Sequence, residues 1–506
     1  MAYGDIDIIV EEFPYSGGIT TEGKGARLFW IHGTVYAIFY NDASANAYIK
    51  TLNITTSGDI GGVIATLQYT ASHSVTWNDV LRITGTNIFI IASSAPFATY
   101  EGYITTISIS DAGVIGSQID EYLFAGNAAT NDAVYAPELC HVSGNIYAVV
   151  YQRWKYNGSW SYSFLVKTLT INSSGGITAS VIDTLTIDTG VLSQGLIDII
   201  SIGGGYFAVA YGGVDGDGFV KTFDIDGSGN IGSVQATLEF DTLSAVAPRL
   251  QQLKNQYYAV FYEGVDSDGW VKTMTLNNTD GSISAVIDSW EFDTASARSV
   301  RPIKIAPFTY LVAYEGYYGI TFFHGYIKTM TISDLGIITK TAIDTLVFDA
   351  DVSPGDSVSP LQISNSILAI TTHQASTYAR GHLYTIKVEG SFETIMSSAR
   401  ITGIVERWSA GPNAINQSEL ILGGLASQYF SPLSLLNRPT PTIPETRQAE
   451  RQPARQLPPM PYQPTLRDYA KWLGSRTLEQ QREIFGTQII TFRVWSEWAK
   501  FQRSMG

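Results

Sequence analysis

The stretch Tyr258-Ala259-Val260-Phe261-Tyr262, followed after a short turn by Trp270-Val271-Lys272-Thr273-Met274, decides the fold of this chain. Both strands recur seven times along the first three-quarters of the sequence, with a period of about 51–60 residues. The first strand recurs at 36–40, 88–93, 147–151, 207–211, 258–262, 310–314 and 367–372, and the second at 48–52, 103–107, 165–169, 219–223, 270–274, 326–330 and 383–388. A fixed period of this length indicates a repeat architecture before any local propensity is considered.

Each repeat has room for four strands. In the fifth repeat we expect them at 248–253, 257–262, 270–276 and 287–292, separated by turns rich in Asn, Asp and Gly. These residues tolerate the left-handed backbone that hairpin turns require. One four-stranded sheet of this size cannot bury both of its faces alone, so the repeats must pack against one another. The sequence therefore predicts an all-β fold, a seven-bladed β-propeller of four-stranded blades over residues 1–390.

The seventh repeat lacks an obvious fourth strand after Val388. The N-terminal stretch 5–13 resembles the fourth-strand motif at 287–292, so we expect it to supply that strand. This pairing would close the ring and remove an exposed sheet edge. Residues 399–408 are the alternative donor.

A lysine on the third strand and an aspartate on the fourth keep a constant spacing in three repeats. The pairs are Lys167 with Asp183, Lys272 with Asp288, and Lys328 with Asp344, each 16 residues apart. Neighbouring antiparallel strands can bring such residues opposite one another, so the spacing predicts ion pairs within each blade. Exposed pairs of this kind contribute roughly 0–1 kcal/mol, which indicates a structural device.

The composition changes after the repeats. We expect a β-hairpin at 391–428, a Pro-rich linker at 429–464 and a helical anchor at 465–506, because residues 439–464 hold 8 of the 18 prolines. The predicted helices carry apolar residues at helical spacing, and the expected partner-docking side chains are Trp472, Leu473, Phe485, Phe492, Trp495 and Trp498. Residues 438–506 contain 11 basic and 6 acidic residues, whereas the rest contains 20 and 40. The basic tail therefore suits docking to an acidic partner surface.

The loops between the second and third strands of two repeats are rich in aromatic residues. The candidate ligand-binding side chains are Trp154, Tyr156, Trp160 and Tyr162 in the third repeat, and Tyr317, Tyr318, Phe322 and Phe323 in the sixth. Exposed rings beside polar groups suit sugar faces, and they also suit contacts with another subunit. A third interpretation is that the rings pack on one another and stiffen long loops.

Catalytic and metal-binding motifs are scarce. The Asp-rich turns around Asp215, Asp217, Asp266 and Asp268 are weak calcium candidates, but they lack the glutamate that an EF-hand loop requires at its twelfth position. The sequence has no HExxH or GxSxG motif and no Asp-box repeat. The repeated acids recur from blade to blade, as structural residues do. We therefore expect no metal, no cofactor and no enzymatic activity.

The formal net charge of −15 disfavours nucleic acid as a partner. No run of 18 apolar residues predicts a membrane span, and the first ten residues lack the basic and apolar regions of a signal peptide. A composition typical of surface proteins without an export signal fits a virion component made in the host cytoplasm.

The tail resembles a known family. Tyr469-Ala470-Lys471-Trp472-Leu473 followed by 478–486 is similar to a motif of Mu-type minor head (head morphogenesis) proteins of tailed phages, over about 20 of the 506 residues. The sequence lacks the Arg that follows the glycine of that motif. The repeat looks like seven-bladed propellers of predicted phage and environmental proteins. The resemblance implies a virion structural protein with its tail seated in the particle.

We therefore expect a non-enzymatic structural protein of a phage virion. Its propeller is displayed toward a host receptor, a glycan or another subunit, and its C-terminal helices dock it to capsid, portal–neck or tail proteins. Multiple copies per particle are expected, with no nucleic acid or membrane partner. The alternative is a polysaccharide-binding lectin or a glycan-active propeller enzyme.

Overall fold

The computed structural model describes residues 4–16, 24–42, 44–69, 75, 77–95, 101–126, 132–191, 195–318, 322–352, 358–373 and 380–388. The chain divides into two units, 1–430 and 431–506, and these residues all belong to the first. The expected hairpin at 391–428, linker at 429–464 and helical anchor at 465–506 lie outside the described residues.

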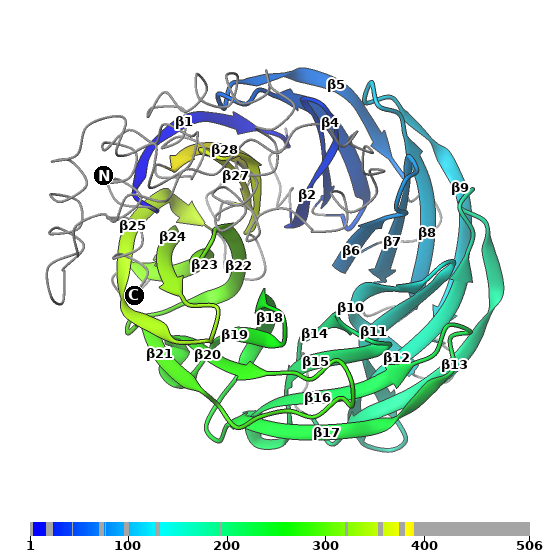
Figure 1. Ribbon diagram of the computed structural model, residues 1–506. Helices are drawn as coiled ribbons and strands as arrows, with labels where there is room; N and C mark the ends of the chain where they lie inside the picture. The colour runs from blue at the N-terminus through cyan, green and yellow to red at the C-terminus, as the bar shows by residue number, and fades with distance from the viewer. Residues whose placement is uncertain are drawn as a thin grey trace, which may run out of the picture. The chain divides into compact units, whose positions relative to one another are not determined.

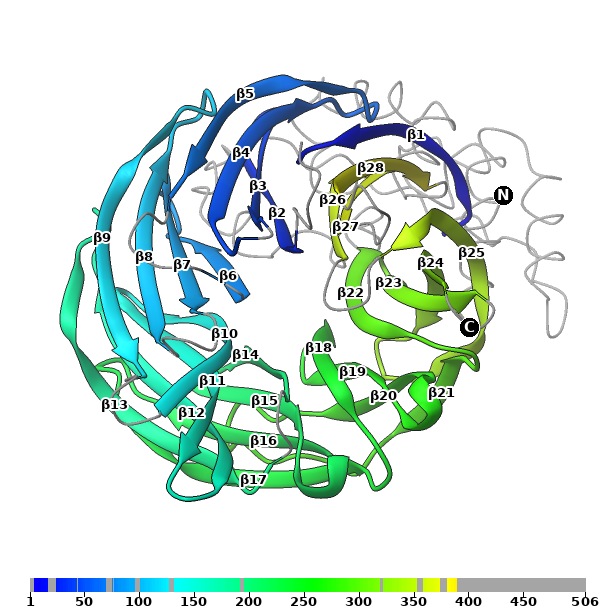
Figure 2. The ribbon, with the colours of Figure 1, turned by 180° about the vertical axis from the view of Figure 1, so that it is seen from behind.

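Seven four-stranded antiparallel sheets stand in a ring (Figures 1 and 2), which confirms the predicted seven-bladed β-propeller. In each blade the strands run from the axis outward, and we name them A to D in that order. Within the described part of the chain, no helix is long and apolar enough to cross a lipid bilayer.

The blades are numbered in chain order. Blade one contains β2 (Lys24–His32), β3 (Val35–Asn41), β4 (Ala47–Ile54) and β5 (Ile60–Gln68), and blade two contains β6 (Trp77–Arg82), β7 (Ile88–Ser94), β8 (Gly102–Ile109) and β9 (Ile115–Ala125). Blade three contains β10 (Asp132–Ser143), β11 (Ile146–Tyr156), β12 (Trp160–Ile171) and β13 (Ile177–Thr189), and blade four contains β14 (Ile197–Gly203), β15 (Tyr206–Gly212), β16 (Gly218–Ile225) and β17 (Ile231–Asp241). Blade five contains β18 (Val246–Lys254), β19 (Tyr257–Glu263), β20 (Gly269–Thr275) and β21 (Asp288–Asp293), and blade six contains β22 (Arg298–Ala306), β23 (Thr309–Tyr318), β24 (Phe322–Ile332) and β25 (Ile338–Val352). Blade seven contains β26 (Ser359–Ser364), β27 (Ile367–His373), β28 (Gly381–Val388) and β1 (Ile6–Pro14). Single-turn 3-10 helices η2 (Val214–Gly216) and η3 (Val265–Ser267) lie between strands B and C of blades four and five.

The N-terminal strand is the outer strand of blade seven. β1 pairs with β28, with Glu12 opposite Tyr384. The Tyr384 hydroxyl donates to Glu12 Oε1 over 3.2 Å, and Lys387 Nζ lies 2.8 Å from Asp7 Oδ2. Two segments were expected as sources of the fourth strand of blade seven. The stretch 5–13 pairs with β28, whereas 399–408 lies outside the described residues.

The hydrophobic core lies between the blades. Seven clusters of buried side chains each join two neighbouring blades, and together they run around the ring. Between blades one and two, for example, the Phe39 and Phe89 rings lie 5.8 Å apart. Strand B is buried on both sides, as in β3 and β27, because each of its faces meets an adjacent blade. Burial of apolar surface between sheets therefore holds the ring together.

A threonine of strand C links every blade to the next. Its hydroxyl donates to a glycine carbonyl in the following blade over 2.5–2.6 Å. The pairs are Thr51–Gly113, Thr106–Gly175, Thr168–Gly229, Thr222–Gly281, Thr273–Gly336, Thr329–Gly4 and Thr385–Gly58. The last two pairs join blade six to Gly4, just before β1, and blade seven to blade one, so they close the circle. This bond explains the threonine of the repeated Lys-Thr motif.

The predicted ion pairs within blades were wrong. Asp288 lies opposite Thr273 in the sheet, one residue from Lys272, so its side chain is on the other face of the blade. The same displacement separates Lys167 from Asp183 and Lys328 from Asp344.

The repeated lysines instead contact the preceding blade. Lys272 Nζ lies 2.8 Å from Asp241 Oδ2, which also accepts the Tyr262 hydroxyl over 2.5 Å. Lys221 with Asp188 and Lys328 with Asp293 repeat this arrangement, whereas Lys167 donates to the carbonyl of Phe124. The aspartates Asp183 and Asp288 accept backbone N–H groups of Ile231 and Ile338 in the following blade. Both residue types therefore connect neighbouring blades.

The strand register defines two faces. In blade three, Asp132 at the start of strand A pairs with Lys155, next to the hairpin between strands B and C. Thr189 at the end of strand D pairs with Ser163 at the same end of strand C. The B–C hairpins and the D–A connections therefore share one face, which we call the B–C face.

Candidate functional site: a charged cluster at the axis

One position of strand A carries a charged side chain in six of the seven blades. In blade five this residue is Arg249, which pairs with Phe261, and in blade three it is Glu138, which pairs with Val150. The equivalent residues are Arg27, Asp79, Glu138, Asp198, Arg249 and Arg301, with Ser359 in blade seven. Strand A is innermost in every blade (Figure 1), so closing the ring gathers these residues around the axis. We call the six charged residues the axial cluster.

Four residues of the axial cluster follow a bulge in strand A. The register shifts just before Arg27, Glu138, Arg249 and Arg301. Two positions earlier the backbone is left-handed, at Gly25 (φ 59°), Ala136 (φ 46°), Ala247 (φ 48°) and Ser299 (φ 52°). Residues with a Cβ rarely adopt this conformation, which costs on the order of 1–3 kcal/mol. Bulges redirect side chains and are frequent beside active sites, so their repetition here points to the axis as a site.

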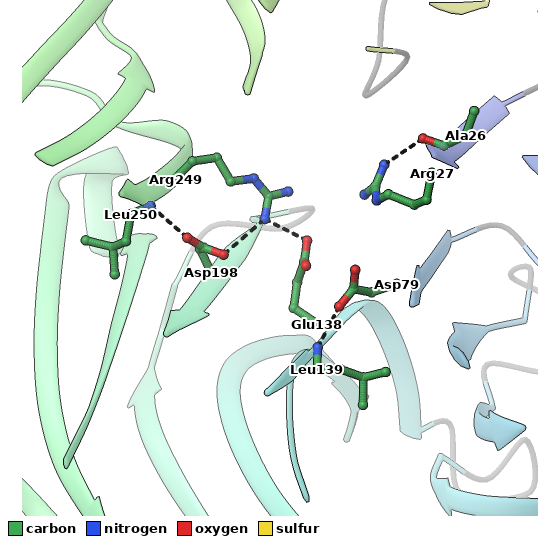
Figure 3. A network of polar contacts seen from close by, with 8 residues as sticks. All are labelled: Ala26, Arg27, Asp79, Glu138, Leu139, Asp198, Arg249 and Leu250. Atoms are coloured by element: carbon green, nitrogen blue, oxygen red, sulfur yellow. Dashed lines mark hydrogen bonds and ion pairs between the residues drawn. The ribbon is translucent and has the colours of Figure 1, made fainter. Parts of the chain in front are cut away.

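Arg249 joins three blades at the axis. Its Nη1 lies 2.6 Å from Glu138 Oε1 and 3.5 Å from Asp198 Oδ1 (Figure 3). Asp198 Oδ2 also accepts the backbone N–H of Leu250 over 2.7 Å. The Arg249 side chain is 6% exposed, whereas those of Glu138 and Asp198 are each 15% exposed. The two carboxylates are thus held by protein groups but keep some surface open to solvent.

Asp79 lies beside this arrangement on blade two. Its Oδ2 accepts the backbone N–H of Leu139, the residue after Glu138, over 2.8 Å. Figure 3 shows the carboxyl groups of Asp79 and Glu138 side by side on the axial side of their strands. Arg27 Nη1 donates to the Ala26 carbonyl over 3.3 Å and stands across from Asp79. Carboxyl and guanidinium groups from the inner strands of blades one to five therefore face a shared space.

The carboxyl groups of the axial cluster differ in acidity. Burial and the charge of Glu138 raise the pKa of Asp79 to about 7, although Arg27 opposes the rise. For Glu138, burial acts to raise the pKa, but the guanidinium groups of Arg249, Arg301 and Arg27 outweigh it and lower the pKa. Burial also raises the pKa of Asp198, against the effect of Arg249. Near pH 7 the partly protonated carboxyl of Asp79 therefore lies beside the ionised carboxylate of Glu138.

The axial cluster was not predicted from the sequence. Its residues occupy one structural position but differ in type from blade to blade, so they do not appear as a repeated motif. The signal was a charged residue beside apolar ones on strand A, such as Asp198 between Ile197 and Ile199 and Glu138 before Leu139. An alignment of the repeats on strand B places five of these residues in one column, eight positions before the first residue of that strand, and leaves Asp79 one position away from it.

The structure brings the four predicted residues of blade three together. The centroid of the Trp154 ring lies 5.5 Å from that of Tyr162 and 6.4 Å from that of Trp160, and Trp160 lies 5.2 Å from Tyr156. Trp154 is buried, whereas Tyr156 and Trp160 are 42% and 43% exposed. These rings therefore combine mutual packing with an exposed apolar surface.

The predicted residues of blade six pack more closely on one another. The Tyr317 and Phe323 rings lie 4.2 Å apart, and the Arg298 guanidinium lies 5.2 Å and 5.3 Å from their centroids. Arg298 Nε also lies 3.4 Å from Glu263. Tyr318 pairs with Phe322 in the sheet, but their side chains lie outside the described part of the structure. The described rings here pack on one another and on Arg298.

The Asp-rich loops form compact turns. Asp215 and Asp266 are left-handed in η2 and η3, with φ of 60° and 58°. The Gly213 and Gly264 N–H groups donate to the carbonyls of Asp217 and Asp268 over 2.7 Å. Among the described residues, no group of three or more His, Cys, Asp or Glu side chains is placed to hold a metal ion. The tail residues Trp472, Leu473, Phe485, Phe492, Trp495 and Trp498 lie outside the described ranges.

No protein-family model matches the sequence, and no curated protein matches it. Solved structures do resemble the propeller. A crystal structure of a protein of unknown function from Dyadobacter fermentans matches with a TM-score of 0.45 and 8% identity, over 76% of this chain and 99% of that one. A mutant sialidase of Trypanosoma rangeli with trans-sialidase activity gives 0.38 and 10%, over 80% and 63%. An α-L-arabinanase of Penicillium chrysogenum bound to arabinobiose gives 0.41 and 11%, over 74% and 98%.

At these identities the matches show the fold alone. They correct the prediction that the chain is not an enzyme, because propellers of this fold include a sialidase and an arabinanase. That prediction treated every acid as part of the structural repeat. The acids of the axial cluster, Asp79, Glu138 and Asp198, instead lie outside the repeated Lys-Thr and Asp motifs.

Proposed function

We propose that this propeller cleaves glycosidic bonds at the axial cluster, with Asp79 as the general acid and Glu138 as the ionised carboxylate. The observation that carries the proposal is that these two carboxyl groups lie on adjacent inner strands at the axis, where Glu138 follows a bulge in strand A and contacts Arg249. Hydrolysis of a glycosidic bond needs two carboxyl groups with different protonation states, and different environments can supply that difference.

The chemistry assigns one task to each group. Asp79 donates its proton to the glycosidic oxygen as the bond to the anomeric carbon breaks, and the released alcohol keeps that proton. Glu138 stabilises the positive charge that develops at the anomeric carbon and assists the addition of water. One water proton stays in the new anomeric hydroxyl group, and the other passes, directly or through Glu138, to Asp79 and restores its acid form. Arg249 holds Glu138 in place and keeps it ionised, so it acts as a positioning residue.

The test uses the full chain and a panel of polymers: arabinan, xylan, a β-glucan and polygalacturonate. We expect release of new reducing ends from at least one polymer, and a loss of about 100-fold or more in rate for Glu138→Gln, since acid–base groups contribute that much. Glu239→Gln is the control, because Glu239 is exposed on the outer strand β17. Wild-type protein that releases no reducing ends from the panel, or equal rates in both variants, would refute the proposal.

We also propose a location for this propeller, from the sequence alone. The acidic propeller and the basic, Trp-rich segment 465–506 support attachment of many copies to a virion, through capsid, portal–neck or tail proteins. A chain truncated after Leu436 should then fail to enter particles while keeping its glycan activity. Incorporation of the truncated chain would rule out docking through the tail.

A further inference from the structure

We infer that a row of aromatic side chains on the B–C face of blades two and three binds consecutive sugar units of a polysaccharide and leads the chain toward the axis. The row consists of Trp77, Tyr135, Trp154, Tyr162, Trp160 and Tyr156. This inference names the substrate class of the proposed function, a polymer rather than a short glycoside, and rests on that function. The row itself is defined by ring contacts and can be tested separately.

The inner end of the row lies beside the axial cluster. Trp77 precedes Asp79 by two residues on β6, and Tyr135 precedes Glu138 by three residues on β10. The two rings lie 5.3 Å apart in an edge-on contact, which links strand A of blade two to that of blade three. Tyr135 pairs with Gln152, toward the B–C end of the blade. The row therefore begins on the strands that carry the two carboxyl groups, on their B–C side.

The row continues outward along the β11–β12 hairpin. Trp154 stacks on Tyr135 with centroids 5.3 Å apart and an interplanar angle of 27°, and its Nε1 donates to Gln152 Oε1 over 2.6 Å. That hydrogen bond holds the buried Trp154 indole in place as a packing support for the outer rings. Trp160 and Tyr156 form the outer end and expose 43% and 42% of their surface. Rigid rings of this kind give a large contact area at low cost in conformational entropy.

Polar groups accompany the rings. Asp132, the first residue of β10, and Arg153 on β11 form an ion pair of 3.7 Å, with 27% and 33% of their side chains exposed. Lys155 lies opposite both Asp132 and Ser161 in the sheet. Sugar units present apolar C–H faces to rings and hydroxyl groups to such polar side chains. Together with its continuity with the axial carboxyls, this composition favours a glycan chain over an apolar protein segment.

The experiment measures binding and turnover in the full-length protein. The probes for binding are the four polymers of the panel, used in affinity electrophoresis with Tyr156→Ala, Trp160→Ala and the double variant. Trp30→Ala is the matched control: Trp30 is 51% exposed on β2 and lies beside the turn between strands A and B, on the opposite face. We expect the double variant to weaken binding about tenfold or more, and Trp30→Ala to leave it within about twofold.

The possible results test the binding role of the row and the proposed catalytic function separately. If the row guides a polymer, the double variant raises KM for the polymer but leaves the rate on a short aryl glycoside of the same sugar unchanged. If the double variant hydrolyses the polymer with the wild-type KM and binds it as tightly as the wild type does, the proposed binding role of the row is wrong. The proposed function then stands. Binding that depends on Tyr156 and Trp160 without any hydrolysis would support the row and refute the function. If the wild-type protein binds none of the four polymers, the proposed binding role of the row is wrong.

Discussion

Arg249 of blade five lies 2.6 Å from Glu138 of blade three, so one ion pair passes the inner strand of blade four. Asp198 of blade four lies 3.5 Å from the same guanidinium nitrogen. The closed ring is what brings these residues together, because 111 positions separate Arg249 from Glu138 along the chain. The ion pair therefore depends on the closed ring, and it holds Glu138 in place for the proposed reaction at the axis.

Removal of Arg249 should destabilise the protein strongly. In Arg249→Met the carboxylates of Glu138 and Asp198 lose a shared, 6%-exposed partner, and breaking a buried pair typically costs about 3–5 kcal/mol. Denaturant unfolding with a reversible transition measures this change. The control is Arg153→Met, because Arg153 is 33% exposed and 3.7 Å from Asp132, so its loss should cost about 0–1 kcal/mol. Equal effects of the two substitutions would contradict a buried ionic centre.

The acidity of Asp79 predicts a stability change with pH. Its pKa is raised to about 7 in the folded protein, above the value of about 3.9 expected in an unfolded chain. Between these values the folded state binds more protons at Asp79, so the free energy of unfolding from this group falls as pH rises. Asp79→Asn removes that proton and keeps an acceptor for the Leu139 N–H.

The comparison is made between wild type and Asp79→Asn in urea at about pH 4.5 and pH 8. We expect the variant to gain stability relative to wild type at the higher pH. A stability difference between the two proteins that is the same at both values would show that Asp79 has an ordinary pKa.

The hydrogen bonds from threonine hydroxyl groups between blades predict that removal of one such bond lowers the stability of the protein. Thr273→Val keeps the shape of the side chain but leaves the carbonyl of Gly336 without its 2.6 Å donor, which should cost about 1–3 kcal/mol. Thr275→Val on the same strand is the control, because the described structure gives its hydroxyl no hydrogen bond. Thermal unfolding of both variants measures the difference. A Tm of Thr273→Val equal to that of the control would show that the bond is dispensable.

The propeller fold could be predicted from the sequence because its period and turn residues repeat locally. The motif at 5–13 also identified the strand that pairs with β28. The lysine partners were predicted wrongly because spacing along the chain does not fix which face of the sheet a residue occupies: Asp288 differs from the expected position opposite Lys272 by one residue. The axial cluster was missed because Asp79 and Glu138 become neighbours only when separate blades close the ring.

Loss of the N-terminal strand should open the ring. Deletion of residues 1–14 removes β1, exposes the edge of β28, and takes away the Gly4 carbonyl that Thr329 contacts. Unpaired strand edges associate with one another, so we expect a lower Tm and oligomers on size-exclusion chromatography. A peptide with residues 1–14 added in trans should restore the elution volume of the full-length protein. A truncated chain that elutes and unfolds like the full-length protein without the peptide would contradict closure through β1.

The most direct test of the axial site compares two aspartates with matched structural roles. Asp79 and Asp183 each accept a backbone N–H of the following blade over 2.8 Å, but Asp79 lies at the axis and Asp183 on the outer strand β13. The measurement is the rate of reducing-end release by Asp79→Asn and Asp183→Asn on the polymer that the wild type degrades. Our account predicts a loss of about 100-fold or more for Asp79→Asn and near wild-type rates for Asp183→Asn. Equal rates in the two variants would contradict catalysis at the axis.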